Sequence, residues 1–360
     1  MAEKILMKGN EAIAISAIRN GADGYFGYPI TPQSEVMETL MKERPWLTTG
    51  MVVLQAESET SSINMVYGGA SCGKKVMTSS SSPGISLMCE GISYLAGAEL
   101  PCVIVNCQRG GPGLGTIQAS QSDYNQCVKG GGHGDYNAIV LAPSSAQDMY
   151  DHVDLGFDLA FKYRTPVIIL ADGIIGQMME KVELRPEKPR MTAEEIKAIA
   201  PWATVGKPAD RKYNVITSLA MESDAHEAFN RKLHAKYEEI KENEVRYDIY
   251  MADDAEYIFV AFGCSARICE AAVDLLREEG IKAGLLRPVT LFPFPSKKLA
   301  ELSENVKSMM TLELNMGQMV DDVRLAVNGR CPVGFYGRQG GNIFTPEEIA
   351  DAFQKFTNLK

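Results

Sequence analysis

The stretch "PCVIVNCQRGGPGLGT", residues 101–116, joins a continuous apolar run to a glycine-rich loop. A β-branched run without polar alternation is typical of a strand buried on both faces. Similar runs recur on either side, each next to a helical segment: "VVLQ", "KKVMTS", "AIVLA" and "PVIILAD". Strands that alternate with helices predict an α/β fold with a mostly parallel sheet.

The spacing of apolar residues predicts where helices and domains lie. Helices are expected over residues 10–19, 33–44, 57–67, 83–96 and 146–163. From residue 183 the rhythm stops, first in the polar linker "ELRPEKPRMTAEEIK" and then in a solvated, mixed-charge helix over 222–244. A second βα series starts at "YIFVAFG" and closes with a helix over 347–356. We expect a first domain over 1–190, a linker with a charged helix over 191–250, and a smaller α/β domain over 251–360.

Composition limits the classes of partner. The chain has 360 residues, 45% of them hydrophobic, which is ample for a full core. Its net charge of -10 argues against nucleic acid as a partner, because phosphate binding needs a basic face. Neither a membrane-spanning apolar run nor the core of a signal peptide is found in the sequence. A cytoplasmic protein is therefore expected.

The cysteines do not form a cluster motif. None of the eight is part of a C-x-x-C pair, the spacing that zinc and iron–sulfur sites usually show. We interpret them as reduced, mostly buried thiols. If the protein works with an iron–sulfur cluster, that cluster is expected in another chain.

Two of the loops after predicted strands contain candidate site residues, since ligands of open α/β sheets bind beyond the carboxyl ends of strands. "GYFGY" is followed by Y-P-I-T-P, in which Pro29 and Pro32 fix the backbone around Thr31. The Thr31 hydroxyl could bind an anion, or the segment could be a rigid turn that caps a helix. "VVLQ" is followed by Glu57 and Glu59, which offer either favourable charge at a helix start or one buried carboxylate for proton transfer.

Two further loops contain hydroxyl groups and a single cation. The run Ser79–Ser82 precedes Pro-Gly and could bond a ligand or simply cap a helix. Arg109 stands alone among the glycines of "QRGGPGLGT". Its guanidinium could bind a carboxylate or phosphate, and the alternative is a flexible loop with a solvated arginine.

Several familiar motifs are missing. The sequence contains no P-loop, no G-x-G-x-x-G, no H-E-x-x-H and no clear nucleophile elbow. A nicotinamide or ATP enzyme is therefore poorly supported. Of the four histidines, only His133, in "KGGGHGDY", lies in a candidate loop.

Taken in order, six stretches resemble the 2-oxoacid:ferredoxin oxidoreductase family: "FGYPITPQSE", "LQAESE", "MTSSSSPGISLMCEGISYLAGAELPCVIVN", "QRGGPGLGT", "SQSDY" and "KGGGHGDY". The resemblance covers essentially the whole chain. It implies a parallel-sheet domain of the thiamine-diphosphate-binding type, which holds the pyrimidine, followed by a smaller transketolase C-terminal-like α/β domain, to which "LLRPVTLFPFPSKKL" is similar. "MKGNEAIA" and the short "RGGPGLG" loop resemble the 2-oxoisovalerate (3-methyl-2-oxobutanoate) branch.

The resemblance implies oxidative decarboxylation of a 2-oxo acid to an acyl-CoA, with the electrons passed to ferredoxin. By motif, Glu59 rather than Glu57 is the carboxylate that bonds the aminopyrimidine ring of thiamine diphosphate. Pro29 and Ser82 lie in the stretches expected to contact that cofactor.

The resemblance also assigns the substrate site. Thr31 and Arg109 correspond to the residues that bind the substrate carboxylate, and Thr116 is expected to line the same pocket. Arg109→Ala should then abolish turnover while leaving cofactor binding largely intact.

The resemblance implies that this chain carries half of an active site. "ADGIIGQ" has Ala before the Asp, so the Gly-Asp-Gly motif that holds diphosphate and Mg²⁺ is missing. A beta subunit should supply that site, and ferredoxin-like and gamma subunits should complete the assembly, with iron–sulfur clusters among these partners and with coenzyme A and ferredoxin as co-substrates. A hetero-oligomer is expected, and a homodimer of this chain alone is left open. Two alternatives also remain: the same chemistry on 2-oxoglutarate, and a non-catalytic scaffold or regulatory subunit.

Overall fold

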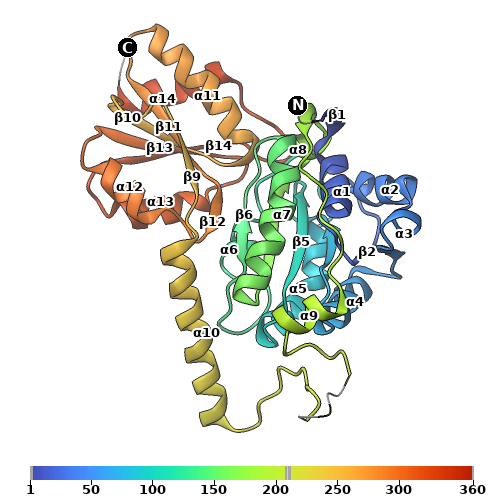
Figure 1. Ribbon diagram of the computed structural model, residues 1–360. Helices are drawn as coiled ribbons and strands as arrows, with labels where there is room; N and C mark the ends of the chain where they lie inside the picture. The colour runs from blue at the N-terminus through green and yellow to red at the C-terminus, as the bar shows by residue number, and fades with distance from the viewer. Residues whose placement is uncertain (1–2, 207–208, 210–211, 359–360) are drawn as a thin grey trace.

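The computed structural model describes residues 3–206, 209 and 212–358. It contains two α/β units, each built on a largely parallel sheet, and the long helix α10 (Ser223–Asn243) leads into the second unit (Figure 1). A parallel-sheet domain followed by a smaller α/β domain was the fold class expected from the sequence, and it is confirmed.

The first unit is a seven-stranded sheet in the order β12-β6-β7-β5-β4-β2-β3. Neighbouring strands are parallel except for β12, which is antiparallel to β6. The central strands are wholly buried, as their continuous apolar runs predict. The strands are β2 (Gly24–Gly27), β3 (Val52–Gln55), β4 (Val76–Ser80), β5 (Cys102–Gln108), β6 (Ile139–Leu141), β7 (Pro166–Asp172) and β12 (Thr290–Phe292).

Helices cover both faces of this sheet, with α1 packed on α7 over one face and α4 packed on α5 over the other (Figure 1). Side-chain caps start several of them: Ser58 accepts from the backbone of Ser61 at the start of α4, and Ser145 does the same for α7. The helices of this unit are α1 (Gly9–Arg19), α2 (Ser34–Glu43), α3 (Pro45–Thr48), α4 (Glu59–Ser71), α5 (Ser82–Gly97), α6 (Tyr124–Val128), α7 (Ala146–Tyr163) and α8 (Gly173–Gln177).

The second unit is a five-stranded sheet in the order β14-β13-β10-β11-β9, covered by α11 and α14 on one face and by α12 and α13 on the other. Only β9 runs antiparallel to its neighbour. Its elements are β9 (Tyr247–Tyr250), β10 (Tyr257–Val260), α11 (Gly263–Glu278), β11 (Ala283–Pro288), α12 (Ser296–Ser303), β13 (Ser308–Glu313), α13 (Met319–Val327), β14 (Val333–Gly337) and α14 (Pro346–Thr357).

The start of the chain and the segment between the units add structure that the sequence did not predict. The antiparallel ribbon of β1 (Lys4–Lys8) and β8 (Met179–Glu183) was missed, because its strands are short and largely exposed. The expected linker also contains the short helix α9 (Ala193–Ile199), which buries only Ile196. The charged helix expected over 222–244 is present as α10, which docks through Leu233, Tyr237 and Ile240.

Buried polar contacts hold the second unit against the carboxyl edge of the first sheet. The Gln121 side chain donates to the Phe262 carbonyl at 2.7 Å and accepts from the Ser265 hydroxyl at 2.6 Å. Asp172, at the end of β7, accepts from the backbone of Cys264 at 2.9 Å, and burial raises the pKa of its carboxyl. The second unit therefore borders the loops that follow β5 and β7.

All eight cysteines are free, and six are buried, which confirms the interpretation of reduced thiols. Among residues 3–206, 209 and 212–358, every helix is too short or too polar to cross a lipid bilayer.

Candidate functional site

The candidate site lies at the carboxyl edge of the first sheet. The strands β3, β2, β4 and β5 are consecutive parallel neighbours, so their carboxyl ends lie side by side. The loops after them contain Glu59, Thr31, Ser82 and Arg109 in that order across the edge. Four stretches that are far apart in the sequence thus meet where ligands of open α/β sheets bind.

The Y-P-I-T-P turn is anchored from inside the protein. The fully buried Gln33 donates to the Tyr28 carbonyl at 3.3 Å and accepts from the Ser79 hydroxyl at 2.5 Å. Ser79 in turn accepts from the Tyr25 hydroxyl at 2.7 Å. This chain of bonds fixes the turn on the sheet and leaves Thr31 exposed at the surface.

Arg109 is a buried cation without a counter-ion. Its side chain is 9% exposed and donates to the Thr31 carbonyl at 3.1 Å and to the Leu114 carbonyl at 3.3 Å. Its Nε is buried and has no partner, and no ion pair with a carboxylate is seen for it in the described part of the chain. A guanidinium in this state is suited to binding an anion. The alternative of a flexible loop with a solvated arginine is contradicted.

The glycine-rich loop is closed rather than extended. The backbone N–H of Arg109 donates to the Ser82 hydroxyl at 3.1 Å, and that hydroxyl lies 3.2 Å from the Arg109 carbonyl. The Thr116 N–H donates to the Gly110 carbonyl at 2.8 Å and closes the loop on itself. Gly115 has φ +53, and a Cβ there would lie 1.7 Å from that carbonyl oxygen, so only glycine fits.

Burial separates the two acids of "QAESE". Glu59 is the first residue of α4 and is 6% exposed, whereas Glu57 is exposed and lies near the Ser61 hydroxyl. The Glu59 carboxylate accepts no hydrogen bond from the residues that the structure describes. It packs directly on Gly84, where a Cβ would lie 2.7 Å from Oε1 of Glu59 and 2.0 Å from the Ser80 hydroxyl.

Unused hydroxyl groups lie in the segment that follows β4, and that of Ser80 meets the same side of Gly84 as Glu59. The Ser80 and Ser81 hydroxyls are fully buried and find no partner among the described residues. An aminopyrimidine offers a ring nitrogen and an amino group, so a free carboxylate with hydroxyls beside it fits that half of thiamine diphosphate. Pro29, also expected near the cofactor, lies exposed in its turn, and no contact joins it to Glu59.

A buried polar network lies behind the loop, and no role was predicted for its residues from the sequence. The Asn106 amide donates to the Asp123 carboxylate at 2.9 Å, and the Asp123 N–H donates to the Gln108 side chain at 3.0 Å. Burial raises the pKa of Asp123, although hydrogen bonds from Ser82 and Asn106 oppose the shift. The signal was present in the sequence as polar residues inside the apolar run "VIVNCQ" and as the aspartate of "SQSDY".

A cleft of about 620 Å³ opens next to Arg109, between the two units. Its walls include Ser82, Gly113 and Asp123 from the first unit and Asn315 and Gly340 from the second. The second unit therefore forms one wall of the space next to the candidate site.

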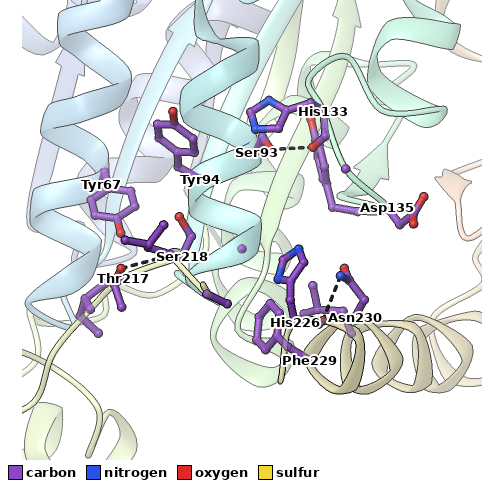
Figure 2. A pocket seen from close by; sticks show the side chains of 17 residues that line it. Tyr67, Ser93, Tyr94, His133, Asp135, Thr217, Ser218, His226, Phe229 and Asn230 are labelled. Atoms are coloured by element: carbon purple, nitrogen blue, oxygen red, sulfur yellow. Dashed lines mark hydrogen bonds between the residues drawn. The ribbon is translucent and has the colours of Figure 1, made fainter. Parts of the chain in front are cut away.

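His133 does not join the site. It lies with Ser93 and Tyr94 in a separate pocket of about 580 Å³ between α4, α5 and the start of α10 (Figure 2). Its carbonyl accepts from the Ser93 hydroxyl at 2.6 Å, and its ring meets Tyr94 edge-on at 5.9 Å (Figure 2). Tyr94 is twelve residues after Ser82 on α5, roughly 18 Å along the helix.

No metal site accompanies this arrangement. Within the described ranges, no group of three or more His, Cys, Asp or Glu side chains could hold a metal ion.

Comparison with known proteins identifies related chains. The family model described as pyruvate flavodoxin/ferredoxin oxidoreductase, thiamine diphosphate binding, matches residues 15–248. The model described as pyruvate:ferredoxin oxidoreductase core domain II matches residues 255–349. The match to both models confirms the resemblance seen in the sequence motifs.

Two curated relatives and one solved structure align over nearly the whole chain. The ketoisovalerate oxidoreductase subunit VorB of Methanothermobacter marburgensis is 49% identical, over 98% of this chain and 97% of that protein. The 2-oxoglutarate synthase subunit KorA of Methanocaldococcus jannaschii is 37% identical, over 96% of this chain and 98% of that protein. The structure of a 2-oxoglutarate:ferredoxin oxidoreductase from Magnetococcus marinus, with 2-oxoglutarate, coenzyme A and succinyl-CoA bound, is 27% identical with a TM-score of 0.84. The alignment covers 98% of this chain and 65% of that chain.

Proposed function

The chain belongs to the 2-oxoacid:ferredoxin oxidoreductase family, and from that premise we propose that it is a subunit of a 2-oxoisovalerate (3-methyl-2-oxobutanoate):ferredoxin oxidoreductase. The reaction is the oxidative decarboxylation of the 2-oxo acid with coenzyme A. It gives an acyl-CoA and carbon dioxide, and the electrons pass to ferredoxin.

One observation carries the proposal. A buried guanidinium without a counter-ion and a buried carboxylate without a donor lie at the same carboxyl edge of the first sheet, after β5 and β3. Leaving both groups unpaired costs stability unless a ligand pairs with them. The ligands that match are the carboxylate of a 2-oxo acid at Arg109 and an aminopyrimidine at Glu59.

Each residue then has a defined task. Thiamine diphosphate, when bound, supplies the electron sink that decarboxylation needs. Glu59 holds a proton at the ring nitrogen of the aminopyrimidine and so controls the charge on that ring. Arg109 and Thr31 bind the substrate carboxylate, and Ser82 and Thr116 keep the loop of Arg109 closed over it.

The partner subunits follow from what this chain does not supply. Its sequence has no Gly-Asp-Gly motif, so a beta subunit holds the diphosphate and Mg²⁺. The iron–sulfur clusters belong to the partner subunits, which include ferredoxin-like and gamma subunits. Exposed apolar side chains near the site edge, including Leu54 and Leu87, suit a face that such a partner covers.

The loop next to Arg109 favours an apolar substrate side chain. A 2-oxoglutarate molecule carries a second carboxylate and needs a second cation. In residues 109–119 Arg109 is the only cation, and the exposed side chains include Leu114, 82% exposed, and Ile117. These groups suit an isopropyl group better than a carboxylate.

The test is an assay of the chain co-produced with its partner subunits, without oxygen. Thiamine diphosphate, Mg²⁺ and coenzyme A are added, and viologen reduction is followed with 2-oxoisovalerate, 2-oxoglutarate, pyruvate and indolepyruvate. Preference for 2-oxoisovalerate supports the proposal. Preference for 2-oxoglutarate keeps the chemistry and rejects the branch, and inactivity on every acid, with clusters present, favours the scaffold alternative.

Arg109→Ala tests the substrate site in the same complex. Turnover should be abolished, because a charge-assisted bond worth about 1.5–3 kcal/mol and the orientation of the acid are both lost. Thiamine diphosphate content should be largely unchanged. Arg164→Ala is the control, since Arg164 also bonds a backbone carbonyl but stacks on Trp202 far from the site. Equal loss of turnover and cofactor binding contradicts a substrate role.

A further inference from the structure

Asn10, the second residue of α1, lies between the two loops that hold the substrate-binding groups. It is fully buried, and its amide group contacts three elements that are distant in sequence. Nδ2 donates to the Pro32 carbonyl at 2.7 Å and to the Glu35 carboxylate at 3.0 Å. Oδ1 accepts from the Cys107 thiol at 3.3 Å.

These contacts reach both candidate substrate ligands through the backbone. Pro32 directly follows Thr31, and Cys107 precedes Arg109 by two residues. A single amide therefore joins the end of the Y-P-I-T-P turn to the end of β5. The direct bond from the Arg109 guanidinium to the Thr31 carbonyl completes a closed ring of contacts.

The surroundings leave Asn10 little freedom. A Cβ on Gly176 would lie 2.7 Å from its Oδ1, so α8 packs against the amide. A Cβ on Gly9 would lie 2.2 Å from the Ile175 carbonyl, which fixes the start of α1 against α8. The Gln177 side chain also donates to the Pro32 carbonyl, at 3.1 Å.

The chemistry of the position selects asparagine. Two N–H donors meet two oxygen acceptors, and one oxygen acceptor meets a thiol donor, so every polar atom of the amide is used. Aspartate would place a second carboxylate against Glu35 and supply no donor. Glutamine would be one methylene longer, and Gly176 leaves no room for it.

We infer that Asn10 is a positioning residue that sets the separation of Thr31 and Arg109, and thereby the affinity for the substrate carboxylate. The inference rests on the proposed function of those two residues. Asn10 itself touches neither substrate nor cofactor, and it acts through the backbones on either side of it.

The experiment measures KM and kcat for 2-oxo acid oxidation by the assembled complex. Asn10→Ala should raise KM for the 2-oxo acid about tenfold and lower kcat less than about threefold, because carboxylate binding is present in the ground state. Ser16→Ala is the control: Ser16 is buried on the same helix and donates to the Tyr150 carbonyl, away from the site. It should lower thermal stability and leave KM unchanged.

A double-mutant cycle distinguishes positioning from general damage. In an Arg109→Lys background, Asn10→Ala should raise KM less than about threefold. The guanidinium that Asn10 positions is already absent there, so removing Asn10 has little further effect on substrate binding. Multiplicative losses in both backgrounds, or an unchanged KM in the single variant, overturn the inference.

A second variant approaches the same link from β5, in case Asn10→Ala does not fold. Cys107→Ala removes the thiol that donates to Asn10 and should raise KM about threefold. Cys102→Ala is its match, since Cys102 is equally buried on β5 but does not contact Asn10, and it should leave KM unchanged. Equal KM values in these two variants contradict the inference. A wild-type complex that oxidises no 2-oxo acid instead rejects the proposed function, and the inference falls with it.

Discussion

Glu59 and Glu313 lie at similar places in the two units, but only the Glu313 carboxylate is hydrogen-bonded within the chain. Each is buried near the carboxyl end of a parallel strand, Glu59 as the first residue of the helix that follows β3 and Glu313 as the last residue of β13. Glu313 accepts from the Asn315 side chain at 2.9 Å and from backbone N–H groups at the start of α13 at 2.8–3.3 Å. Glu59 accepts from no described residue.

The difference separates a structural carboxylate from one that is available to a ligand. At the second sheet the chain uses its own acid to cap α13, so nothing remains for a ligand to bind. At the first sheet Ser58 caps α4, so Glu59 is not needed for that purpose. The acid and two serine hydroxyls are left without partners, and the cation has no counter-ion. Burial alone does not mark a site; burial without an internal partner at a sheet edge does.

Glu59→Gln is the change with the largest expected effect on this comparison. A neutral amide cannot hold the proton at the aminopyrimidine, so kcat should fall about 10²–10⁴-fold, the usual contribution of general acid–base groups. Subunit assembly and thermal stability should be unchanged, because Glu59 bonds to nothing within the chain. Single-turnover viologen reduction by the reconstituted complex measures the rate.

Glu57→Gln is the control for that measurement. Glu57 is exposed and two residues away, so its variant should keep wild-type kcat. Equal losses of activity in the two variants would mean that the difference in burial does not decide which acid acts on the cofactor. The contrast between Glu59 and Glu313 would then have no functional meaning.

Gly84→Ala tests whether the position of the Glu59 carboxylate matters, because it shifts that side chain while keeping the glutamate. A methyl group at residue 84 would lie 2.0 Å from the Ser80 hydroxyl and 2.7 Å from Oε1 of Glu59, so both side chains must shift. A displacement near 1 Å should cost about 10²-fold in kcat. Gly91→Ala on the same helix is the control, because the nearest atoms to its methyl belong to Ile63 and not to Glu59. It should reduce stability and spare kcat, so a Gly84→Ala complex with normal kcat would show that the position of Glu59 is unimportant.

Glu313→Gln tests the other half of the comparison. The amide keeps one acceptor oxygen and turns an NH₂ group toward backbone donors, so at least one buried N–H is left unpaired. We expect a loss of about 1–3 kcal/mol in the free energy of unfolding, seen as a fall in Tm of several degrees. KM and kcat for the 2-oxo acid should not change. A normal Tm with lost activity would reverse the roles assigned to the two acids.

The elements that the sequence predicted well are those with long, regular patterns. The wholly buried strands β5 and β7 stand out as continuous apolar runs, and α7 and α10 have the expected bounds to within a residue or two. The ribbon of β1 and β8 has no such signature, because each strand is stable only through the other. Likewise β12 has three residues and joins the first sheet from the second unit, a contact that depends on the tertiary fold.

The sequence predicted several residues of the candidate site but not the contacts between them. Thr31 and Arg109 were singled out by the prolines and glycines around them, but their direct contact depends on the order of strands in the sheet. Asn10 and Asp123 were quoted within motifs and given no role, because a buried amide or acid is informative only once its partners are known. His133 was flagged for its loop, and the fold places it in another pocket.

His152 provides the test with the smallest expected effect. It asks whether an unpaired buried group away from the sheet edge affects stability without affecting activity. His152 is buried on α7, and its Nδ1 has no partner among the described residues, as with Glu59. His152 lies within α7 rather than at the carboxyl ends of the strands, so its unpaired nitrogen should affect stability alone. Burial lowers the pKa of His152 to about 4, from 6.5. Because the unfolded chain takes up the proton first, the stability present above pH 6.5 is lost as the pH falls toward 4.

His152→Gln should remove this acid sensitivity. Between pH 6.5 and 4 the wild-type chain should lose up to about 1.4 kcal/mol per pH unit from this group, and the variant should lose that much less. His226→Gln is the control, because His226 is exposed and its replacement should leave the slope unchanged. Urea unfolding at a series of pH values gives both slopes. If His152→Gln instead alters KM at neutral pH, an unpaired buried group away from the sheet edge also affects substrate binding. The lack of internal partners around Glu59 then no longer identifies a site.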